Sequence, residues 1–348
     1  MEKRLVLPFE SIQSLPGGIN EVRLYFDDLL DVHRVAKRFD RSMLDVTVLP
    51  EASTLQVIHH QNVVKVSLAG RVDGYDPTMD VIEIHTPYYP RGSITDALLR
   101  NESFAGPDAL TIMQSALRGL RELHMTHKVL HRDIKSGNIL LDNAPIHALV
   151  ADIGVAGRID GNGTAPAVNN PTPYSPPEFT NGILTVSADL YSIGLVMREL
   201  LGGRFPYETI TRDEVIGRLE KGQRALADDV LELPVWAPVR LRRVYQKAIA
   251  VDPAKRYQSA REMAGDLAKV VLVNWAQTSE NVWTASANSG SRIYIVTATP
   301  EAGGVRLSMT KQTRSGPRRL PGYSDEVVPS LTHKNASRFF DRVNAIAA

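Results

Sequence analysis

Short runs of β-branched and apolar residues, separated by turn residues, make up the chain as far as about residue 86. The runs at residues 63–66 and 81–84 have the length, the composition and the polar or glycine-containing boundaries of strands. One helix is expected in this part, at about residues 51–59. The N-terminal part of the chain is therefore predicted to be a small unit rich in β-structure.

From about residue 108 the apolar residues recur at helical spacing. The stripe over residues 112–123 repeats every three or four positions, which is typical of a helix with one buried face. Residues 160–173 are rich in Gly, Asn, Thr and Pro and show no periodicity, so they predict a loop. Further helices are predicted at residues 189–201, 240–251 and 259–275.

The pattern changes again after residue 275. Strand-like runs occur at residues 282–285, 292–299 and 305–310, and a helix is predicted at residues 335–347. Nine basic and five acidic side chains give residues 276–348 a formal charge of +4, in a chain whose total is +1. We therefore divide the chain into residues 1–86, residues 87–275, and a small α/β domain of three strands and a helix at residues 276–348.

The composition excludes several kinds of site. The chain has no cysteine, which rules out disulfides, thiolate metal sites and a cysteine nucleophile. Near the N-terminus, Pro8 and Glu10 interrupt the chain before an apolar segment of signal-peptide length has formed. No apolar run approaches the roughly eighteen residues that a membrane helix needs. We expect a cytoplasmic protein that does not act at a membrane.

Residues 131–138, His-Arg-Asp-Ile-Lys-Ser-Gly-Asn, contain the side chains that phosphoryl transfer needs for positioning and for neutralising charge. Asp133 can orient a hydroxyl group and accept its proton, and Lys135 can neutralise the transferring phosphoryl group. Asn138 can bind a metal ion, as can Asp152, which lies nineteen positions after Asp133. Taken alone, either aspartate is equally a turn residue.

These residues resemble the H-R-D-x-K-x-x-N catalytic loop and the D-F-G segment of the protein kinase family, with Ile153 in the Phe position. The resemblance implies an α+β fold of two lobes, a small β-rich N-lobe and a helical C-lobe. It also implies ATP as the phosphoryl donor. Mg²⁺, or alternatively Mn²⁺, would be held by Asn138 and Asp152.

Three later segments resemble the large lobe of the same family. Residues 174–178 are similar to its A-P-E segment, residues 189–194 to the D-x-Y-S-x-G start of its central helix, and residues 252–257 to its late D-P-x-x-R segment. The resemblance implies a buried ion pair between Glu178 and Arg256. This pair, together with Arg132, favours a protein substrate over a small molecule. Lys135 favours transfer to Ser and Thr over Tyr.

The motif expected to cover the phosphates of ATP is incomplete. Gly17 and Gly18 lie where the glycine-rich loop of the family belongs, and Val22 lies at the position of its valine. Leu15 and Asn20 replace two of its glycines. The segment resembles a phosphate-covering turn, and taken alone it is also compatible with an ordinary hairpin turn.

The lysine and glutamate of the small lobe have candidates too. Lys37 lies fifteen residues after Val22, which is the family spacing for the lysine that binds the α- and β-phosphates. Glu51 is the candidate for its glutamate partner on a short helix that Pro50 can begin. The alternative is that Glu51 is an acidic residue favoured at a helix start by the dipole.

Residues 84–93 resemble the hinge between the lobes of a kinase. By this resemblance Thr86 is the gatekeeper residue, and backbone groups near Tyr88 and Tyr89 bind adenine. The side chains expected to sandwich the base are those of Val22, Val35 and Leu140.

The predicted loop at residues 160–173 also contains candidate phosphorylation sites. By family analogy, Arg132 beside the catalytic aspartate implies control by a phosphorylated loop, because a phosphate carries nearly two negative charges that arginine can pair with. Thr164 and Thr172 are the candidate acceptors. Both residues are equally compatible with a role as turn formers.

We therefore predict an ATP-dependent protein Ser/Thr kinase that is itself a phosphoprotein and acts on protein substrates. One alternative, suggested by the incomplete glycine-rich loop, is a pseudokinase scaffold. Residues 276–348 are interpreted as a docking or regulatory module. The basic segment at residues 311–319 is predicted to be a loop, and binding of nucleic-acid phosphates there is the second alternative.

Overall fold

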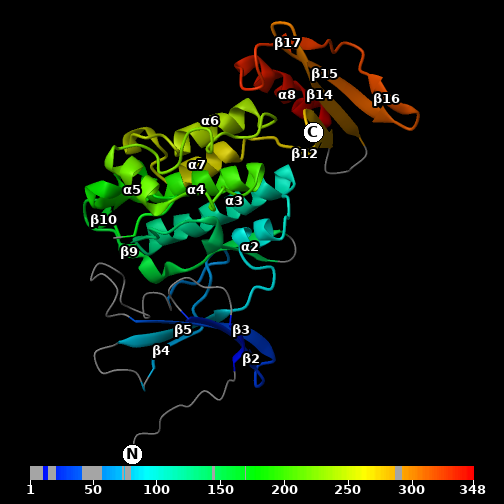
Figure 1. Cartoon of the computed structure of the whole chain (residues 1–348). Helices are drawn as coiled ribbons and strands as arrows, with labels where there is room; N and C mark the ends of the chain where they lie inside the picture. Colours follow the sequence, from blue (N-terminus) through cyan, green and yellow to red (C-terminus); the bar gives the residue numbers. More distant parts are fainter. Residues whose placement is uncertain are drawn as a thin grey trace, which may run out of the picture.

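The computed structural model describes residues 11–14, 21–40, 57–72, 74, 80–142, 146–168, 170–286 and 292–348. These residues form a small β-sheet, a helical body and a second β-sheet with one helix (Figure 1). The sequence predictions for Gly17, Gly18 and Glu51 lie outside the described residues, as does most of the helix expected at residues 51–59.

The small sheet is antiparallel, and its strand order is β1-β2-β3-β5-β4. Its strands are β1 (Ser11–Ser14), β2 (Glu21–Asp27), β3 (Val32–Asp40), β4 (Leu68–Arg71) and β5 (Val81–Pro87). A tight turn joins β2 to β3, where Asp31 has a φ of 54° and the carboxylate of Asp27 accepts from the backbone N–H of Leu30. The strand predicted at residues 81–84 is confirmed as part of β5.

The prediction of a strand at residues 63–66 is wrong. Within this segment only Val63 forms a bridge, to Val150, and the backbone is otherwise irregular. Val63, Val64 and Val66 are all buried against the helical body. A short apolar run has the same pattern in a buried extended segment as in a strand, so periodicity alone could not distinguish the two.

The helical body surrounds one central helix. Its helices are α2 (Ile94–Leu99), α3 (Gly106–Arg121), α4 (Val186–Gly202), α5 (Arg212–Glu220), α6 (Val239–Ala248) and α7 (Ala260–Leu267). Every residue of α4 from Ser187 to Leu201 except Arg198 is buried. A helix that is apolar on all sides is stable in water only when other elements enclose it, so α4 forms the axis of this body.

Short antiparallel strand pairs connect the helices and loops of the helical body. They are β6 (Val129–Leu130) with β9 (Gly157–Arg158), β7 (Ile139–Asp142) with β8 (His147–Val150), and β10 (Thr164–Pro166) with β11 (Ile183–Thr185). The predicted loop at residues 160–173 thus includes the strand β10.

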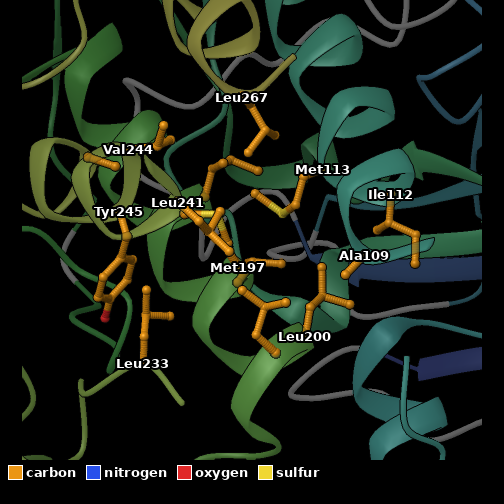
Figure 2. Packing of buried hydrophobic residues seen from close by; sticks show 14 of the residues in the cluster. Ala109, Ile112, Met113, Met197, Leu200, Leu233, Leu241, Val244, Tyr245 and Leu267 are labelled. Carbon is orange, nitrogen blue, oxygen red and sulfur yellow. The ribbon is translucent and has the colours of Figure 1, made fainter. Parts of the chain in front are cut away.

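The main apolar core joins α3, α4, α6 and α7. Met113 of α3, Met197 of α4, Leu241 of α6 and Leu267 of α7 are at most 1% exposed and converge in one cluster (Figure 2). The spacing predicted for helices 112–123, 189–201 and 240–251 corresponds to the buried faces of α3, α4 and α6. After α3 the chain continues in a π-helical turn at Glu122–Thr126.

The helix predicted at residues 259–275 is too long, because α7 ends at Leu267. Val270, Leu272 and Val273 are buried in the extended segment that follows, whereas Val271 is exposed. The side chain of Asn344 accepts a hydrogen bond from the backbone N–H of Val273 and donates one to the carbonyl of Val271. These contacts with a residue about seventy positions away hold the segment extended, and no local pattern reports them.

The second sheet has the order β12-β13-β14-β15-β16, with β17 also paired to β15. Among the described residues its elements are β12 (Asn274–Ser279), β13 (Val282–Ser286), β14 (Ile293–Glu301), β15 (Gly304–Thr313), β16 (Gly316–Arg319), β17 (Glu326–Val328) and α8 (Lys334–Ala347). The three predicted runs correspond to β13, β14 and β15. The predicted number of strands is wrong, because β12 and β16 are mostly polar and β17 has only three residues.

The basic segment at residues 311–319 is not a loop. It forms the hairpin between β15 and β16, in which Lys311 lies opposite Arg318. Two like charges directly opposite each other on paired strands are unfavourable. The hairpin therefore presents concentrated positive charge at the edge of the second sheet.

The second sheet is fixed to the helical body by aromatic stacking and buried hydrogen bonds. The rings of Trp236 and Trp275 stack with centroids 6.2 Å apart and an interplanar angle of 11°, and Phe340 of α8 packs against Trp275. The carboxylate of Asp341 accepts from the backbone N–H of Val239 at the start of α6. In the part of the chain that the structure covers, no helix combines the length and the apolar character needed to cross a membrane.

Candidate active site

The backbone of the predicted catalytic loop is held by a buried carboxylate at the start of α4. Asp189 accepts hydrogen bonds from the N–H groups of His131 and Arg132 at 2.8 and 2.9 Å. His124 contacts the same carboxylate at 2.8 Å. Burial on its own would raise the pKa of Asp189, but the hydrogen bond and charge of His124 outweigh it, so the pKa is lowered. The ionised carboxylate thus holds the loop in its bent path.

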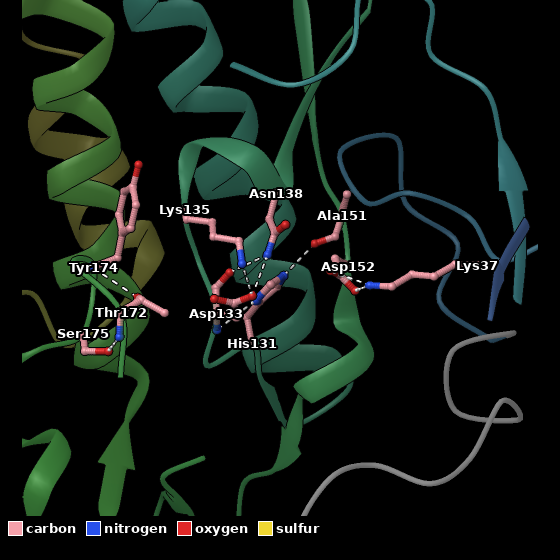
Figure 3. Close-up of polar contacts among 10 residues, drawn as sticks. All are labelled: Lys37, His131, Asp133, Lys135, Asn138, Ala151, Asp152, Thr172, Tyr174 and Ser175. Atoms are coloured by element: carbon pink, nitrogen blue, oxygen red, sulfur yellow. Dashed lines mark hydrogen bonds and ion pairs between the residues drawn. The ribbon is translucent and has the colours of Figure 1, made fainter. Parts of the chain in front are cut away.

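Two predicted catalytic side chains, Asp133 and Lys135, meet the predicted metal ligand Asn138 within this loop (Figure 3). The ammonium group of Lys135 lies 2.7 Å from Oδ2 of Asp133. The side-chain amide of Asn138 donates to the backbone carbonyl of Asp133 at 2.7 Å and to Oδ2 at 3.0 Å. Both donors approach Oδ2, and no described group donates a hydrogen bond to Oδ1. The carboxylate is therefore oriented and keeps one oxygen for a further hydroxyl group.

Lys37 of β3 reaches across to Asp152 in the helical body. Its Nζ lies 2.7 Å from both carboxylate oxygens (Figure 3). Burial would raise the pKa of Asp152, but the charge of Lys37 and its hydrogen bonds outweigh it, so the pKa is lowered. Asp152 has a φ of 59°, in the left-handed region, which directs its side chain toward the small sheet. The pair links two residues 115 positions apart.

The two predicted metal ligands fit a hard divalent cation. Asp152 offers a carboxylate, and Asn138 uses its side-chain nitrogen on Asp133, which leaves its amide oxygen as the donor atom. Oxygen donors of this kind suit Mg²⁺, which takes its remaining ligands from phosphates and water. Among the described residues no three His, Asp or Glu side chains cluster as a complete metal site. The two oxygen donors of Asp152 and Asn138 suit a cation that is bound partly by protein and partly by phosphate.

The predicted base-binding residues of the small sheet share one face. In the strand register Val22 lies opposite Lys37, and Val35 lies opposite Thr86, so these side chains project to the same side as the lysine. Leu140 of β7, which belongs to the helical body, packs in one apolar cluster with Tyr89.

Two backbone groups of the predicted hinge are already hydrogen-bonded. The N–H of Tyr88 donates to the carbonyl of His33 at 3.3 Å, which extends the pairing between β3 and β5. The carbonyl of Tyr89 accepts from the N–H of Gly92 at 2.9 Å. Contacts to a base at this hinge would therefore come from other backbone groups of the same segment, such as the N–H of Tyr89.

The predicted ion pair between Glu178 and Arg256 is present. Arg256 donates to both carboxylate oxygens, at 2.7 and 2.6 Å, and its side chain is 0% exposed. It also donates to the carbonyls of Ala250 and Val251, and its guanidinium lies 4.8 Å from the ring centroid of Tyr191. The pair therefore fastens the segment after the catalytic loop to the chain beyond α6.

The two candidate phosphorylation sites occupy different surroundings. Thr164 lies on β10, and its hydroxyl donates to the carboxylate of Asp160 at 3.0 Å. The hydroxyl of Thr172 accepts from the N–H of Tyr174, and the N–H of Thr172 donates to the hydroxyl of Ser175 (Figure 3). Both threonines take part in turns of the segment that follows Asp152.

Sequence reasoning missed Glu199, a buried carboxylate of α4. It accepts from the hydroxyl of Ser136 in the catalytic loop at 2.5 Å and from the hydroxyl of Tyr207 at 3.0 Å. The hydroxyl of Tyr174 and the backbone N–H of Phe205 also donate to it. An acidic residue within an otherwise apolar helix was the available signal, because a buried carboxylate requires several donors.

Comparison with known proteins gives the following matches. A family model described as "Protein kinase domain" matches residues 27–266. The chain is 26% identical over 259 residues to "Serine/threonine-protein kinase PrkC" of Bacillus subtilis, covering 72% of this chain and 38% of that protein. It is 30% identical over 253 residues to "LysM domain receptor-like kinase 3" of Arabidopsis thaliana, covering 66% of this chain and 37% of that protein. The chain thus spans less than two fifths of the length of these relatives.

Proposed function

The chain belongs to the protein kinase family, and from this premise we propose that it transfers the γ-phosphoryl group of ATP to serine and threonine hydroxyls of protein substrates. The observation that carries the proposal is the arrangement of Asp133, Lys135 and Asn138. An oriented carboxylate with one available oxygen, beside an ammonium group, is what a phosphoryl transfer to a hydroxyl requires.

Asp133 acts on the acceptor in this mechanism. Its Oδ1 accepts a hydrogen bond from the incoming hydroxyl group, which directs the hydroxyl oxygen at the γ-phosphorus. As the new P–O bond forms and the bond to the β-phosphate oxygen breaks, the hydroxyl proton passes to Asp133 and ADP leaves. Lys135, held 2.7 Å from Oδ2, lies where it can neutralise negative charge on the transferring group.

Lys37, Asp152 and Asn138 act on the nucleotide. Lys37 binds the α- and β-phosphates, which requires that its pairing with Asp152 be shared with phosphate oxygens. Asp152 and Asn138 would hold Mg²⁺ through their oxygen atoms. When bound, the metal ion neutralises charge on the phosphates. Val22, Val35, Thr86 and Leu140 line the space proposed for the base.

Specificity for serine and threonine has two supports. Lys135 occupies the position that resembles the Ser/Thr members of the family, and one relative is named a serine/threonine-protein kinase. A further relative, 31% identical over 214 residues, is named "Dual specificity protein kinase pyk3" of Dictyostelium discoideum. Acid hydrolysis of the labelled product and identification of the phosphoamino acid distinguishes the two specificities.

Transfer from radiolabelled ATP to the protein itself and to a generic basic protein tests the proposal. Removing a general base costs about 10²–10⁴-fold in rate, so Asp133→Asn should lose transfer by at least about 100-fold while it still binds ATP. Asp229→Asn, an identical change at an exposed position, is the matched control and should retain the wild-type rate. Wild-type protein that binds ATP and transfers no label would instead be a pseudokinase scaffold.

The second sheet is proposed to be a docking or regulatory module. The hairpin that pairs Lys311 with Arg318 offers a positively charged edge for a partner. Titration of the full chain with an oligonucleotide at several salt concentrations tests the nucleic-acid alternative. A steep fall of affinity with salt would favour nucleic acid, and no binding would favour a protein partner.

A further inference from the structure

Arg132 is surrounded by backbone carbonyls of the segment that follows Asp152. Its Nε donates to Val155 at 2.8 Å, its Nη1 to Pro166 at 2.7 Å, and its Nη2 to Ala156 at 3.0 Å. The residue is 8% exposed. All three guanidinium nitrogens are therefore used by main-chain acceptors that come from both ends of one loop.

The guanidinium also packs tightly against Gly157. A Cβ atom placed on Gly157 would lie 2.6 Å from Cζ of Arg132 and 2.8 Å from Nη1. Any larger residue at position 157 would therefore displace the guanidinium, which is enclosed on that side by the glycine. A phosphate that took any of these three N–H groups would displace a carbonyl, and the displaced carbonyl would then need a new donor.

The rest of the segment is held by backbone pairing and by a carboxylate-closed turn. β10 pairs with β11, the N–H of Ile159 donates to the carbonyl of Lys128, and the N–H of Ala167 donates to that of Gly182. Between these contacts the carboxylate of Asp160 accepts from the N–H groups of Asn162 and Thr164. A turn closed by a carboxylate needs no added negative charge.

The surroundings of Thr164 oppose a phosphate there. Its hydroxyl lies 3.0 Å from Oδ2 of Asp160, and no described arginine or lysine forms an ion pair with that carboxylate. A phosphate on Thr164 would bring nearly two negative charges against a carboxylate that stays ionised. Like charges at this distance repel, so the phosphate would weaken the turn that it is expected to strengthen.

We infer that Arg132 is a positioning residue that holds the activation segment, residues 152–178, through backbone carbonyls, so that the segment adopts its working arrangement without loop phosphorylation. The inference rests on the proposed kinase function. It differs from the expectation drawn from the sequence, in which Arg132 waits for a phosphate on Thr164 or Thr172. Arg132 acts by fixing the activation segment, against which the protein substrate is expected to bind, and it does not touch the reacting atoms.

The first test uses wild-type protein freed of phosphate by a phosphatase and checked by mass spectrometry. Its initial rate of transfer to a protein substrate should lie within about twofold of the rate after preincubation with ATP, with no lag. Amide hydrogen exchange of residues 155–167 should be slow in the phosphate-free protein. A lag with a more than tenfold gain in rate, or fast exchange that slows on phosphorylation, would overturn the inference.

The exchange measurement separates this inference from the proposed function. If neither form of the protein transfers phosphate, the kinase proposal fails, and slow exchange at residues 155–167 still supports the role of Arg132. If both forms are active and the segment exchanges rapidly, the kinase proposal stands and the role of Arg132 is wrong.

The variant Arg132→Lys keeps the charge but lacks the planar group that reaches several acceptors at once. We expect faster exchange at residues 155–167 and a KM for the protein substrate raised about tenfold, with ATP binding unchanged. Arg158→Lys, the same change at an exposed residue of β9, is the control for both measurements. An unchanged KM and unchanged exchange in Arg132→Lys would contradict a positioning role.

The variants Thr164→Val and Thr164→Glu give opposite results under the two views. If no phosphate is needed, Thr164→Val should keep activity within about twofold, and Thr164→Glu should lose it because of repulsion by Asp160. If a phosphate on Thr164 activates the enzyme, Thr164→Val should resemble the phosphate-free state and Thr164→Glu should restore activity. The latter pair of results would overturn the inference.

Discussion

Replacement of Arg256 by methionine should destabilise the helical body strongly. The wild-type guanidinium donates four hydrogen bonds, two to the carboxylate of Glu178 and two to the carbonyls of Ala250 and Val251. Methionine fills a similar volume and can donate none of them. Glu178, whose side chain is 11% exposed, would keep its charge and lose its partner.

The magnitude follows from the burial of the pair. Removing one partner of a buried ion pair costs about 3–5 kcal/mol, because it leaves an uncompensated charge. The two carbonyls that lose a donor place the expected loss at the upper end, about 5 kcal/mol. Native domains are typically stable by about 5–15 kcal/mol, so the variant is expected to be only marginally folded. Glu178→Gln also leaves the buried charge of Arg256 uncompensated, but it keeps one acceptor oxygen, so it should cost about 3 kcal/mol, at the lower end of the range.

Urea unfolding followed by tryptophan fluorescence measures these losses, since Trp236, Trp275 and Trp283 all lie at or near the contact between the helical body and the second sheet. The double variant Arg256→Met with Glu178→Gln should lose clearly less than the sum of the single variants, because it leaves no unpaired charge. Arg261→Met, at an exposed arginine of α7, is the control and should change stability by less than about 0.5 kcal/mol.

A loss below about 1 kcal/mol in Arg256→Met would refute the reasoning, since it would mean that water or a neighbouring donor replaces the guanidinium. Additive losses in the double variant would refute it as well. They would show that Glu178 and Arg256 contribute independently to stability and that their interaction free energy is close to zero.

Three further predictions concern other parts of the chain. The hydrogen bond from His85, against burial and with help from Arg38, lowers the pKa of Glu83 to about 2. The ionised form of Glu83 therefore contributes about 3 kcal/mol to the free energy of unfolding, which is fully present above about pH 4.5 and is lost as the pH falls toward 2. Between pH 5 and pH 3, urea unfolding should show a smaller decrease in the free energy of unfolding for Glu83→Gln than for wild type. Because Lys37 occupies the carboxylate of Asp152, Mg²⁺ without nucleotide should raise the Tm of Lys37→Met more than that of wild type or Lys37→Arg, and equal shifts would contradict the competition. Trp236→Ala should cost about 3 kcal/mol and separate the unfolding of the second sheet from that of the helical body, whereas a single unchanged transition would show that the stacked rings contribute little.

The residues of the catalytic loop could be predicted because their chemistry is local. Asp133, Lys135 and Asn138 lie within six positions of one another, and one turn of backbone brings them together. The ion pair between Glu178 and Arg256 could be predicted only through resemblance, since 78 positions separate its members. The pairing of Lys37 with Asp152 was not predicted, because the sequence named a different partner for the lysine.

The errors in the predicted fold have a common physical cause. The end of α7 at Leu267 and the extended segment after it depend on hydrogen bonds from Asn344, far along the chain. The strand β16 is polar, because an edge strand buries little on either face, and β17 has only three residues, so no alternation marks either strand. Glu199 was missed because its donors come from three separate segments of the folded chain, namely Ser136, Tyr174, and the loop that contains Phe205 and Tyr207.

The stacked pair of Trp236 and Trp275 has a consequence for any partner that the second sheet recruits. A module on a flexible linker lets its bound protein move through a wide volume. The effective concentration of that bound protein at the catalytic loop falls as the linker lengthens. Here the sheet and the helical body share one buried contact, which Asn344 and Asp341 reinforce. A protein bound to the hairpin of β15 and β16 would therefore be presented to Asp133 from one fixed direction, so that the geometry of the contact itself would select which of its hydroxyl groups is reached.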